Sequence, residues 1–397
     1  MNTDQYLKEL AAKVKTRHLH FSAQEYTTRK SKLLPIMQKK GIDVLLITEP
    51  ADINYLTGYS TFEVSLFTCL LLNSDGDMVL LVPSIETGPA FYTSKVNDIV
   101  PYHWSNPQSI TALINASINK LGGQQPTVGV DLQGASLPIQ VYRYLQHTDG
   151  YGQILDGAGL LNSIKIIKSE AELDYLRHSA AITSLAVAET RPYIAAGKTD
   201  DEIAGKAAQV MFASGSGFMN IQPVVTTGYR SSIIHTSNAG HETQAGDAVF
   251  MEFGATWHRY TAPLMNTVVV GKPDPEMKQA FATCQEIYAA LMDTIAPGVP
   301  FSTAARKAQT ALEPIADKVF FSGVYGYTVG AKFPPSWIEG SGFISTKEEG
   351  HFQQNMVFHL PLCLRAPGQW GIGFSETIVV GANGATPITN NIWALES

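Results

Sequence analysis

Two glutamates lie in apolar segments, where a carboxylate could do acid–base or nucleophilic chemistry. Glu252 interrupts the segment VFMEFGA, and Glu376 stands just before the run TIVVG. A buried carboxylate without a partner is costly, so Glu252 either pairs with a cation such as Arg259 or Arg230, or has a raised pKa and serves as base or nucleophile. The same question applies to Glu376, with a solvated strand residue as the alternative. Because side chains alternate along a strand, either Ser375 or Glu376 faces a pocket, but not both.

One histidine adds a group that could move protons at neutral pH. His235 ends the segment QPVVTTGYRSSIIH. Imidazole has an unperturbed pKa of about 6.5 and can therefore both deliver and remove a proton. A single histidine is more often structural, so its assignment as acid and base depends on the motif around it.

Further candidates lie on two predicted hairpins and on the loop that follows GYTVG. They are the polar residues His258, Arg259, Tyr260 and His359 and the aromatic residues Phe333 and Trp337. Aromatic rings around a planar cation would contribute about 0.5–2 kcal/mol each, although isolated aromatic residues more often belong to a core. We expect some of these side chains to face a substrate.

The elements that must position these side chains fall into two parts. Residues 1–163 alternate helical stretches with short apolar runs such as VLLI at 44–47 and MVLLVP at 78–83, which predicts an α/β domain with a buried sheet. Ser169 and Glu172 then form an S-x-x-E capping box that begins a helix. The second domain is predicted to cover residues 164–397.

The second domain is predicted to contain an internal repeat. The segments IAAG at 194–197 and IAPG at 295–298 each separate two predicted helices, and two hairpins end in the similar strings NTVVVG and ETIVVG. Each unit would be two helices with antiparallel strands, so we expect an α+β domain with pseudo-two-fold symmetry. A site between the two halves is the natural expectation.

Composition excludes several classes of function. A net charge of -7 offers no basic surface for nucleic acid, and the apolar runs are shorter than the roughly 20 residues that span a bilayer. Charged residues are 16% of the chain, against about 25% in an average soluble protein, which favours an oligomer. The N-terminus lacks the apolar core of a secretory signal, so we expect a cytoplasmic protein. Cys69, Cys284 and Cys363 are predicted to be buried thiols.

Taken in order, these motifs resemble the pita-bread superfamily of creatinase, Xaa-Pro aminopeptidase, prolidase and methionine aminopeptidase. The resemblance rests on IKSEAEL, QPVVTTGYRSSIIH, VFMEFGATWHRYTAPLMNTVVVG, GYTVGAKFPPSW and GFSETIVVG, with INYLTGY resembling the N-terminal domain of the longer members. It implies an α/β N-terminal domain followed by a pita-bread C-terminal domain.

The resemblance departs from the family where most members hold two divalent metals. Those peptidases use two Asp, one His and two Glu to activate a water molecule. The matching positions here are Glu252, Pro263, Tyr327, Pro361 and Ser375. Because a proline side chain cannot bind a metal, the resemblance implies neither a metal nor another cofactor.

Metal-free branches of the superfamily suggest another chemistry. Creatinase acts on a C–N bond of a guanidino acid, and ectoine hydrolase opens a cyclic amidine; HRYTAPL, MVFHL and FSET resemble ectoine-hydrolase-like members. His235 matches the acid–base histidine of creatinase. In creatinase the partner subunit lends an aromatic residue and an Arg to the site, whereas here the matching stretch offers Phe62 but no Arg. Arg230 or Arg259 would then bind a substrate carboxylate, and Asn266, where an Arg is common, leaves the substrate open.

We therefore expect a cytoplasmic homodimer that hydrolyses a non-peptide C–N bond in a small zwitterionic amidine, guanidine or cyclic amide without metal. The charged C=N group would lie between Glu252 and Glu376, His235 would shuttle protons, and Tyr327 would donate a hydrogen bond or only fill space. The N-terminal domain of one subunit would lie near the other's site. The alternatives are a creatinase-like amidinohydrolase, a non-catalytic binding protein, and a metal-dependent Xaa-Pro dipeptidase. The altered ligand set of that dipeptidase would be Glu252, His258, His359 and Glu376.

Overall fold

The fold is described from a computed structural model that covers residues 1–106, 109–148 and 150–396. Contacts divide the chain into two compact units, Met1–Ile164 and Lys165–Ser397, whereas the sequence placed the boundary between residues 163 and 164. Each unit is described by itself. No helix within the described residues is long and apolar enough to cross a bilayer, and all three cysteines are buried and free.

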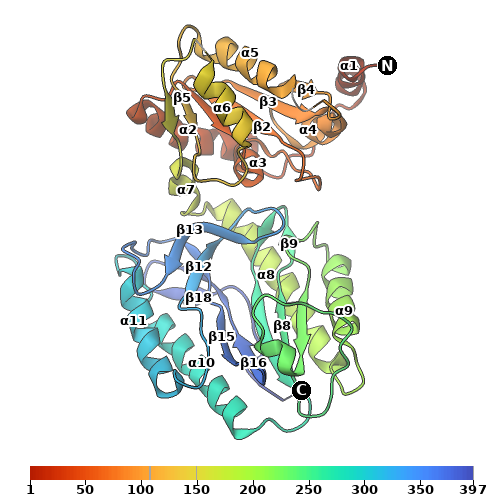
Figure 1. Ribbon diagram of the computed structural model, residues 1–397, viewed down its shortest axis with the longest axis vertical. Helices are drawn as coiled ribbons and strands as arrows, with labels where there is room; N and C mark the ends of the chain where they lie inside the picture. The colour runs from red at the N-terminus through yellow and green to blue at the C-terminus, as the bar shows by residue number, and fades with distance from the viewer. Residues whose placement is uncertain (107–108, 149, 397) are drawn as a thin grey trace. The chain divides into compact units, whose positions relative to one another are not determined.

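The first unit is a mixed six-stranded sheet with helices on both faces (Figure 1). The strand order is β4-β3-β2-β1-β5-β6, with β1 antiparallel to β2 and parallel to β5. The strands are β1 (Val44–Ile47), β2 (Cys69–Asn73), β3 (Met78–Pro83), β4 (Asp98–Tyr102), β5 (Val128–Val130) and β6 (Ile154–Asp156). The helices are α1 (Thr3–Lys13), α2 (Ala23–Lys40), α3 (Pro50–Thr57), α4 (Thr87–Thr93), α5 (Ile110–Gly122), α6 (Ile139–His147) and α7 (Leu160–Lys165).

Strand alternation explains why this sheet is covered on both sides. In β1, Val44 and Leu46 pack in the cluster that contains α5 and α6, whereas Leu45 and Ile47 pack in the cluster that contains α2 and α3. A continuous apolar strand therefore contributes to two cores. The structure confirms the α/β N-terminal domain.

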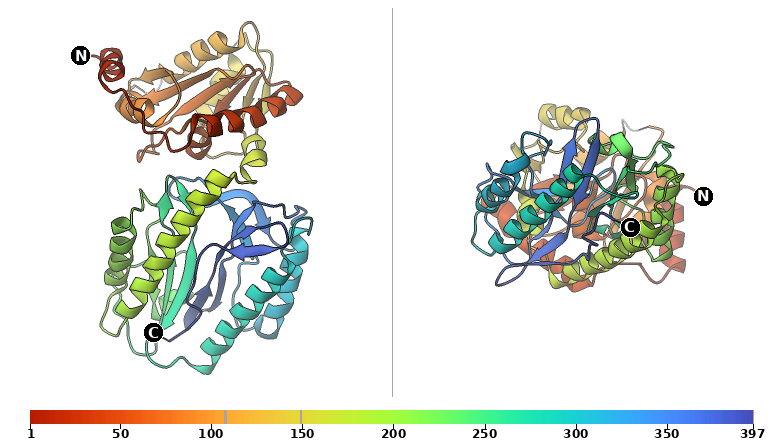
Figure 2. Two further views of the ribbon diagram at one scale, coloured as in Figure 1. Left: turned by 180° about the vertical axis from the view of Figure 1, so that it is seen from behind. Right: turned by 90° about the horizontal axis from the view of Figure 1, so that it is seen from below.

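The second unit contains two helix pairs that flank its strands on opposite sides (Figure 2). The helices are α8 (Glu170–Thr190), α9 (Asp200–Ala213), α10 (Pro275–Thr294) and α11 (Phe301–Leu312). The first half has the sheet β11-β8-β7 and the second half has the sheet β13-β12-β14-β17-β18. The strands are β7 (Val224–Thr227), β8 (Ala248–Phe253), β9 (Thr256–Trp257), β10 (Tyr260–Thr261), β11 (Leu264–Val269), β12 (Gly326–Val329), β13 (Ile338–Ile344), β14 (Val357–His359), β15 (Leu362–Ala366), β16 (Trp370–Phe374), β17 (Thr377–Val380) and β18 (Ala385–Pro387).

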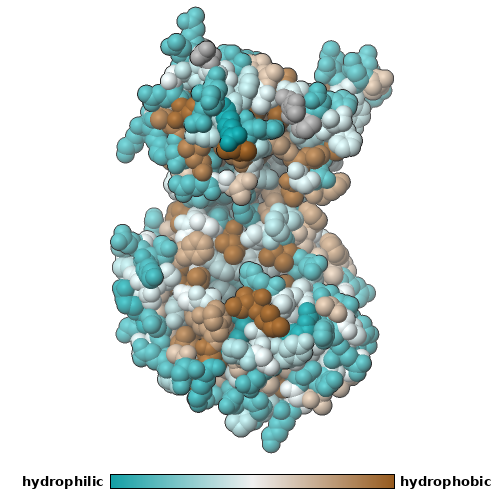
Figure 3. Space-filling model, viewed as in Figure 1, coloured by the Kyte–Doolittle hydropathy of each residue, from teal (hydrophilic) through white to brown (hydrophobic). Residues whose placement is uncertain are grey.

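The predicted repeat is confirmed by the order of the elements, because each half has a helix pair followed by antiparallel strands. Ser169 and Thr199 cap α8 and α9 with complete capping boxes, and Asp274 caps α10 through its side chain. Each half packs its helix pair against its own strands in a separate apolar core. On the face drawn in Figure 3, apolar patches interrupt a mostly hydrophilic surface in both units.

The β15–β16 hairpin brings the two halves of this unit together. The backbone N–H of Gly371 in β16 donates to Ser231 Oγ at 2.7 Å, and that of Gly373 donates to Thr267 Oγ1 at 2.9 Å. Ser231 belongs to the 3₁₀ helix η4 (Gly228–Ser232). A Cβ on Gly371 would lie 2.0 Å from the carbonyl oxygen of Ser231, so only glycine allows this close approach.

Candidate active site

A cavity of about 320 Å³ opens in the second unit between strands of its two halves. This volume is at the lower end of the range for small-molecule sites, roughly 300–1,000 Å³. Its walls include the apolar side chains of Ile221, Val224, Ile233, Phe250 and Ile338. Its chemically active side chains are His235, Glu252, Tyr327, Trp337 and Arg365. A small ligand with an apolar body and charged ends would fit such a lining.

Glu252 is the acidic group of the cavity. It lies on β8, the central strand of its sheet, opposite Met265 on β11 and Val224 on β7. The partly buried carboxyl has no hydrogen bond or ion pair with the described residues. Burial raises its pKa to about 7, and the positive charge of Arg365 partly offsets that effect. Both protonation states of Glu252 are therefore populated at neutral pH, which suits a general base or a nucleophile.

Arg365 is a cavity residue that the sequence analysis missed. It lies on β15, and its guanidinium carbon is 5.7 Å from the centre of the Phe250 ring. The argument used for Glu252 could have found it, because Arg365 is a charge in the apolar strand LCLRA. Alternation places it on the same side of that strand as Cys363, which packs against Phe250.

A chain of hydrogen bonds runs from the cavity into the core. Trp337 Nε1 donates to the hydroxyl oxygen of Tyr327 at 2.9 Å, and that oxygen is 2.8 Å from Nδ1 of His359. Nε2 of His359 is 2.7 Å from Oγ of Ser375, which accepts from the backbone N–H of Met265 at 2.5 Å. Tyr327 and Trp337 line the cavity, whereas His359 is fully buried behind them.

The protons of this chain can be assigned from its bonding. Burial lowers the pKa of His359 to about 3, so its ring is neutral and carries one N–H. Within the described residues, Nε2 is the available acceptor for the Ser375 hydroxyl proton, and the ring then donates from Nδ1 to Tyr327. The Tyr327 oxygen thus accepts two hydrogen bonds, which leaves its own proton for the cavity. Burial raises the pKa of Tyr327 well above its ordinary value, so the hydroxyl stays a donor.

His235 reaches the same cavity from the segment between η4 and β8. Its side chain is exposed and lines the cavity opening, and its backbone has a φ of 54°. A left-handed conformation is uncommon for residues other than glycine and persists only where the surrounding structure holds it. The structure thus places His235, Glu252, Tyr327 and Trp337 around one cavity.

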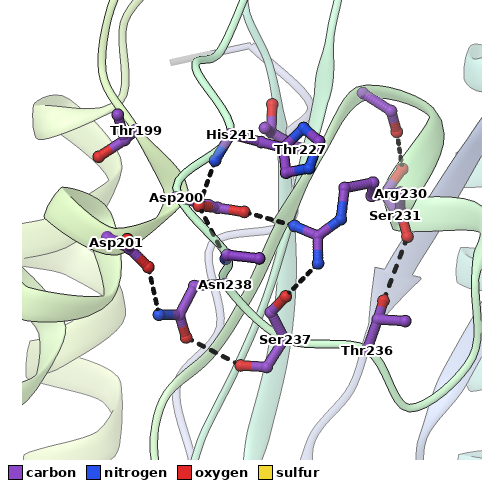
Figure 4. Close-up of polar contacts among 12 residues, drawn as sticks. Thr199, Asp200, Asp201, Thr227, Arg230, Ser231, Thr236, Ser237, Asn238 and His241 are labelled. Carbon is purple, nitrogen blue, oxygen red and sulfur yellow. Dashed lines mark hydrogen bonds and ion pairs between the residues drawn. The ribbon is translucent and has the colours of Figure 1, made fainter.

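Arg230 holds the segment that carries His235 and does not line the cavity. Figure 4 shows its guanidinium between Asp200, 2.6 Å away, and the carbonyl oxygen of Ser237, also 2.6 Å away. The buried carboxylate of Asp200 also accepts from the backbone N–H of His241 at 2.9 Å. These bonds tie the segment to the start of α9. The expectation that Arg230 binds a substrate carboxylate is corrected, because its guanidinium is paired with the buried Asp200 and Arg230 does not line the cavity.

Glu376 also lies outside the cavity. Its carboxylate accepts hydrogen bonds from the hydroxyl of Thr389, the backbone N–H of Asn391 at 3.0 Å and Nε1 of Trp393 at 3.3 Å. The residue therefore holds the C-terminal segment against the second half. The expected placement of a ligand between this glutamate and Glu252 is corrected, because alternation turns Ser375 toward the interior network and Glu376 away from it.

Arg259 and Phe333 form a closed contact of their own. The guanidinium of Arg259 donates to the carbonyl oxygens of Phe218 at 2.6 Å and Lys332 at 3.1 Å, and to the side-chain oxygen of Asn220. It lies over the Phe333 ring, with 4.3 Å from guanidinium carbon to ring centre. Neither residue lines the cavity, which corrects the expectation that they bind the substrate.

The remaining candidates lie elsewhere. The hydroxyl of Tyr260 donates to Glu172 at 2.8 Å, and the ring of His258 packs at 5.0 Å from that of Tyr175. Phe62 belongs to the first unit, where 74% of its surface is exposed. The altered metal set of the dipeptidase alternative is not assembled either. Among the described residues, no three of its members bring ligand atoms within 4.8 Å of one another.

Comparisons with known proteins agree with this architecture. Residues 174–382 match the model of metallopeptidase family M24, and residues 29–167 match that of the creatinase/prolidase N-terminal domain. An uncharacterised hydrolase/peptidase of Sinorhizobium fredii is 27% identical, with 94% of this chain and 97% of the relative covered. Ectoine hydrolase of Halomonas elongata is 24% identical with the same coverage. The crystal structure of a prolidase from Pyrococcus horikoshii matches with a TM-score of 0.80 and 21% identity, covering 93% of this chain and 99% of that one.

Proposed function

The chain belongs to metallopeptidase family M24, a family of hydrolases, and we propose that it hydrolyses a C–N bond. We propose further that this bond is not a peptide bond and that the reaction needs no metal. The substrate class is a small zwitterionic amidine, guanidine or cyclic amide, with ectoine as the leading candidate. The observation that carries the proposal is the cavity that Glu252, with a pKa of about 7, lines together with His235 and Tyr327. The similarity to ectoine hydrolase supports the same substrate class.

The residues at the family's metal positions do not fit two divalent ions. Glu252 is the carboxylate among them, while Tyr327 and Ser375 are both bonded to His359. Pro263 offers only its carbonyl oxygen, which accepts from the Thr377 hydroxyl at 2.7 Å. Hard divalent ions with catalytic roles need several carboxylate or imidazole ligands. The proposed reaction therefore uses only side chains of the protein and water.

The residues of the cavity suffice for hydrolysis of an amidine. In the direct route, ionised Glu252 removes a proton from water, and the water oxygen adds to the amidine carbon. The tetrahedral centre then collapses with cleavage of one C–N bond. The leaving nitrogen takes a proton from His235, and the new hydroxyl becomes a carbonyl oxygen as its proton passes back to the His235 ring. In the covalent route, the carboxylate itself adds to the carbon, and the C–N bond breaks as the leaving nitrogen takes a proton from His235. Water then attacks the same carbon and releases the carboxylate. Both routes need the ionised form of Glu252.

Tyr327 contributes a hydrogen bond in either route. Its hydroxyl oxygen is fixed by Trp337 and His359, so the proton that it directs into the cavity has a defined position. A donor fixed in advance stabilises charge that develops on the reacting group without the cost of reorganisation.

We also propose that the protein is a cytoplasmic homodimer in which the N-terminal domain of one subunit lies near the partner's cavity. Phe62, whose ring is exposed, is the candidate contact, because aromatic residues are enriched at protein–protein interfaces.

Two variants test the chemical roles. His235→Ala should lower turnover of ectoine by about 10²–10⁴-fold, the usual effect of removing an acid–base group, and Glu252→Gln should abolish the ionised form that both routes need. Product formation is measured by NMR, with circular dichroism as the check on folding. The surface variant Glu349→Gln is the control. Near-normal turnover in folded His235→Ala or Glu252→Gln protein would contradict the proposal.

A further inference from the structure

Arg365 differs from the other enclosed arginines of the chain. Within the described residues, its guanidinium has no hydrogen-bond acceptor, and Nε is buried without a partner. Other arginines with little exposed surface donate to carbonyl, amide or carboxylate oxygens. They are Arg29, Arg191, Arg230 and Arg259. Arg365 is thus a cation held in a cavity without the acceptors that the protein gives to similar residues.

The backbone that carries Arg365 is held on two sides. The backbone of Arg365 pairs with Gly371 on β16 and bonds with Phe320 in both directions. Its side chain lies over Phe250, and a Cβ on Gly373 would lie 2.4 Å from that ring. The Phe250 ring is therefore packed tightly against β16, and Arg365 lines the cavity beside it.

The charges of the cavity define what a ligand must bring. Glu252 and Arg365 line the same cavity, and Arg365 acts electrostatically on the pKa of Glu252, but the two side chains are not within 4 Å as an ion pair. An unpaired cation in a partly desolvated site is costly. The planar guanidinium fork matches a carboxylate, with two parallel N–H donors facing two oxygens.

We propose that Arg365 binds the carboxylate of the substrate and thereby sets the specificity of the cavity for carboxylated compounds. This inference rests on the proposed function, because it places the scissile C–N group of the same molecule beside Glu252. Uncharged or purely cationic amidines would leave the guanidinium without an acceptor and are rejected. In this proposal Arg365 on β15 has the role that the sequence suggested for Arg230 or Arg259.

Binding of three related probes tests this role by isothermal titration calorimetry. The probes are ectoine, which carries an amidine and a carboxylate, the same ring without its carboxylate, and cyclohexanecarboxylate, which has no C–N bond. The proteins are wild type, Arg365→Gln, and Arg365→Lys, which keeps the charge but loses the fork. Arg306→Gln removes an exposed arginine of α11 and is the matched control. Thermal melting confirms that each variant is folded.

The expected result is that wild type and Arg306→Gln bind both carboxylates and bind the carboxylate-free ring at least about ten-fold more weakly. Arg365→Gln should bind both carboxylates about 10–100-fold more weakly than wild type, in line with the loss of a charge-assisted pair. The affinity of Arg365→Lys should lie between those of wild type and Arg365→Gln. If wild type binds neither carboxylate, or if Arg365→Gln binds them as wild type does, the inference is overturned. If the carboxylates bind through Arg365 but ectoine is not hydrolysed, the inference stands and the proposed function fails.

Discussion

The raised pKa of Glu252 makes a prediction about stability that does not depend on the substrate. Its pKa is 4.5 in its ordinary state and about 7 in the folded protein. As the pH rises from 4.5 to 7, the unfolded chain loses this proton first, so the folded state loses stability over that interval. Above pH 7, where Glu252 is ionised in both states, this raised pKa lowers the free energy of unfolding by about 3 kcal/mol. Replacement by glutamine keeps the shape of the side chain and removes the cost.

The free energy of unfolding of wild type and Glu252→Gln should therefore diverge with pH. Between about pH 5.5 and about pH 8, the advantage of the glutamine variant should grow by about 2 kcal/mol. Urea unfolding followed by circular dichroism at several pH values measures it, with Glu349→Gln as the exposed control, for which no growth is expected. A difference between Glu252→Gln and wild type that does not change with pH would refute the assignment of a raised pKa to Glu252.

Two further substitutions test how the cavity is built. Tyr327→Phe removes the donated proton but keeps the ring, and should lower kcat by about 10²–10³-fold; kcat within about two-fold of wild type would mean that the hydroxyl only fills space. Arg230→Gln breaks the bonds to Asp200 and Ser237, and should lower kcat by releasing the segment of His235 while affinity for a carboxylated ligand is retained. Steady-state kinetics measures kcat, and calorimetry measures the affinity. If both fall by the same factor, Arg230 binds the substrate directly.

The fold was accessible to sequence reasoning because its signals are local. The capping boxes at Ser169 and Thr199 satisfy amides within the same few residues, so they mark helix starts whatever the rest of the chain does. The two IAxG segments recur at equivalent places in both halves. Repetition of such local signals predicted two helix pairs with antiparallel strands, and the structure contains them.

The site was only partly accessible because its decisive contacts are distant in the sequence. Glu252 and Glu376 look alike in sequence, because both are acidic residues beside apolar runs. In the structure, Thr389 and Trp393 from the C-terminal segment donate hydrogen bonds to Glu376, whereas Glu252 lines the cavity. Arg365 could not be recognised from a motif, because it lies outside the segments that carry the family resemblance, whereas Arg259 lies within one of them. A systematic search for charges in apolar strands finds Glu252 and Arg365 together.

The central claim is hydrolysis of a non-peptide C–N bond without metal, and one measurement tests it most directly. Purified protein is dialysed against a chelator, its metal content is determined, and product formation is followed by NMR with ectoine and, in parallel, with Xaa-Pro dipeptides. Metal-stripped protein is expected to open the ectoine ring at the rate of untreated protein and to leave the dipeptides intact. Cleavage of a Xaa-Pro dipeptide that is lost with the chelator and restored by a divalent metal, without ring opening, would contradict it.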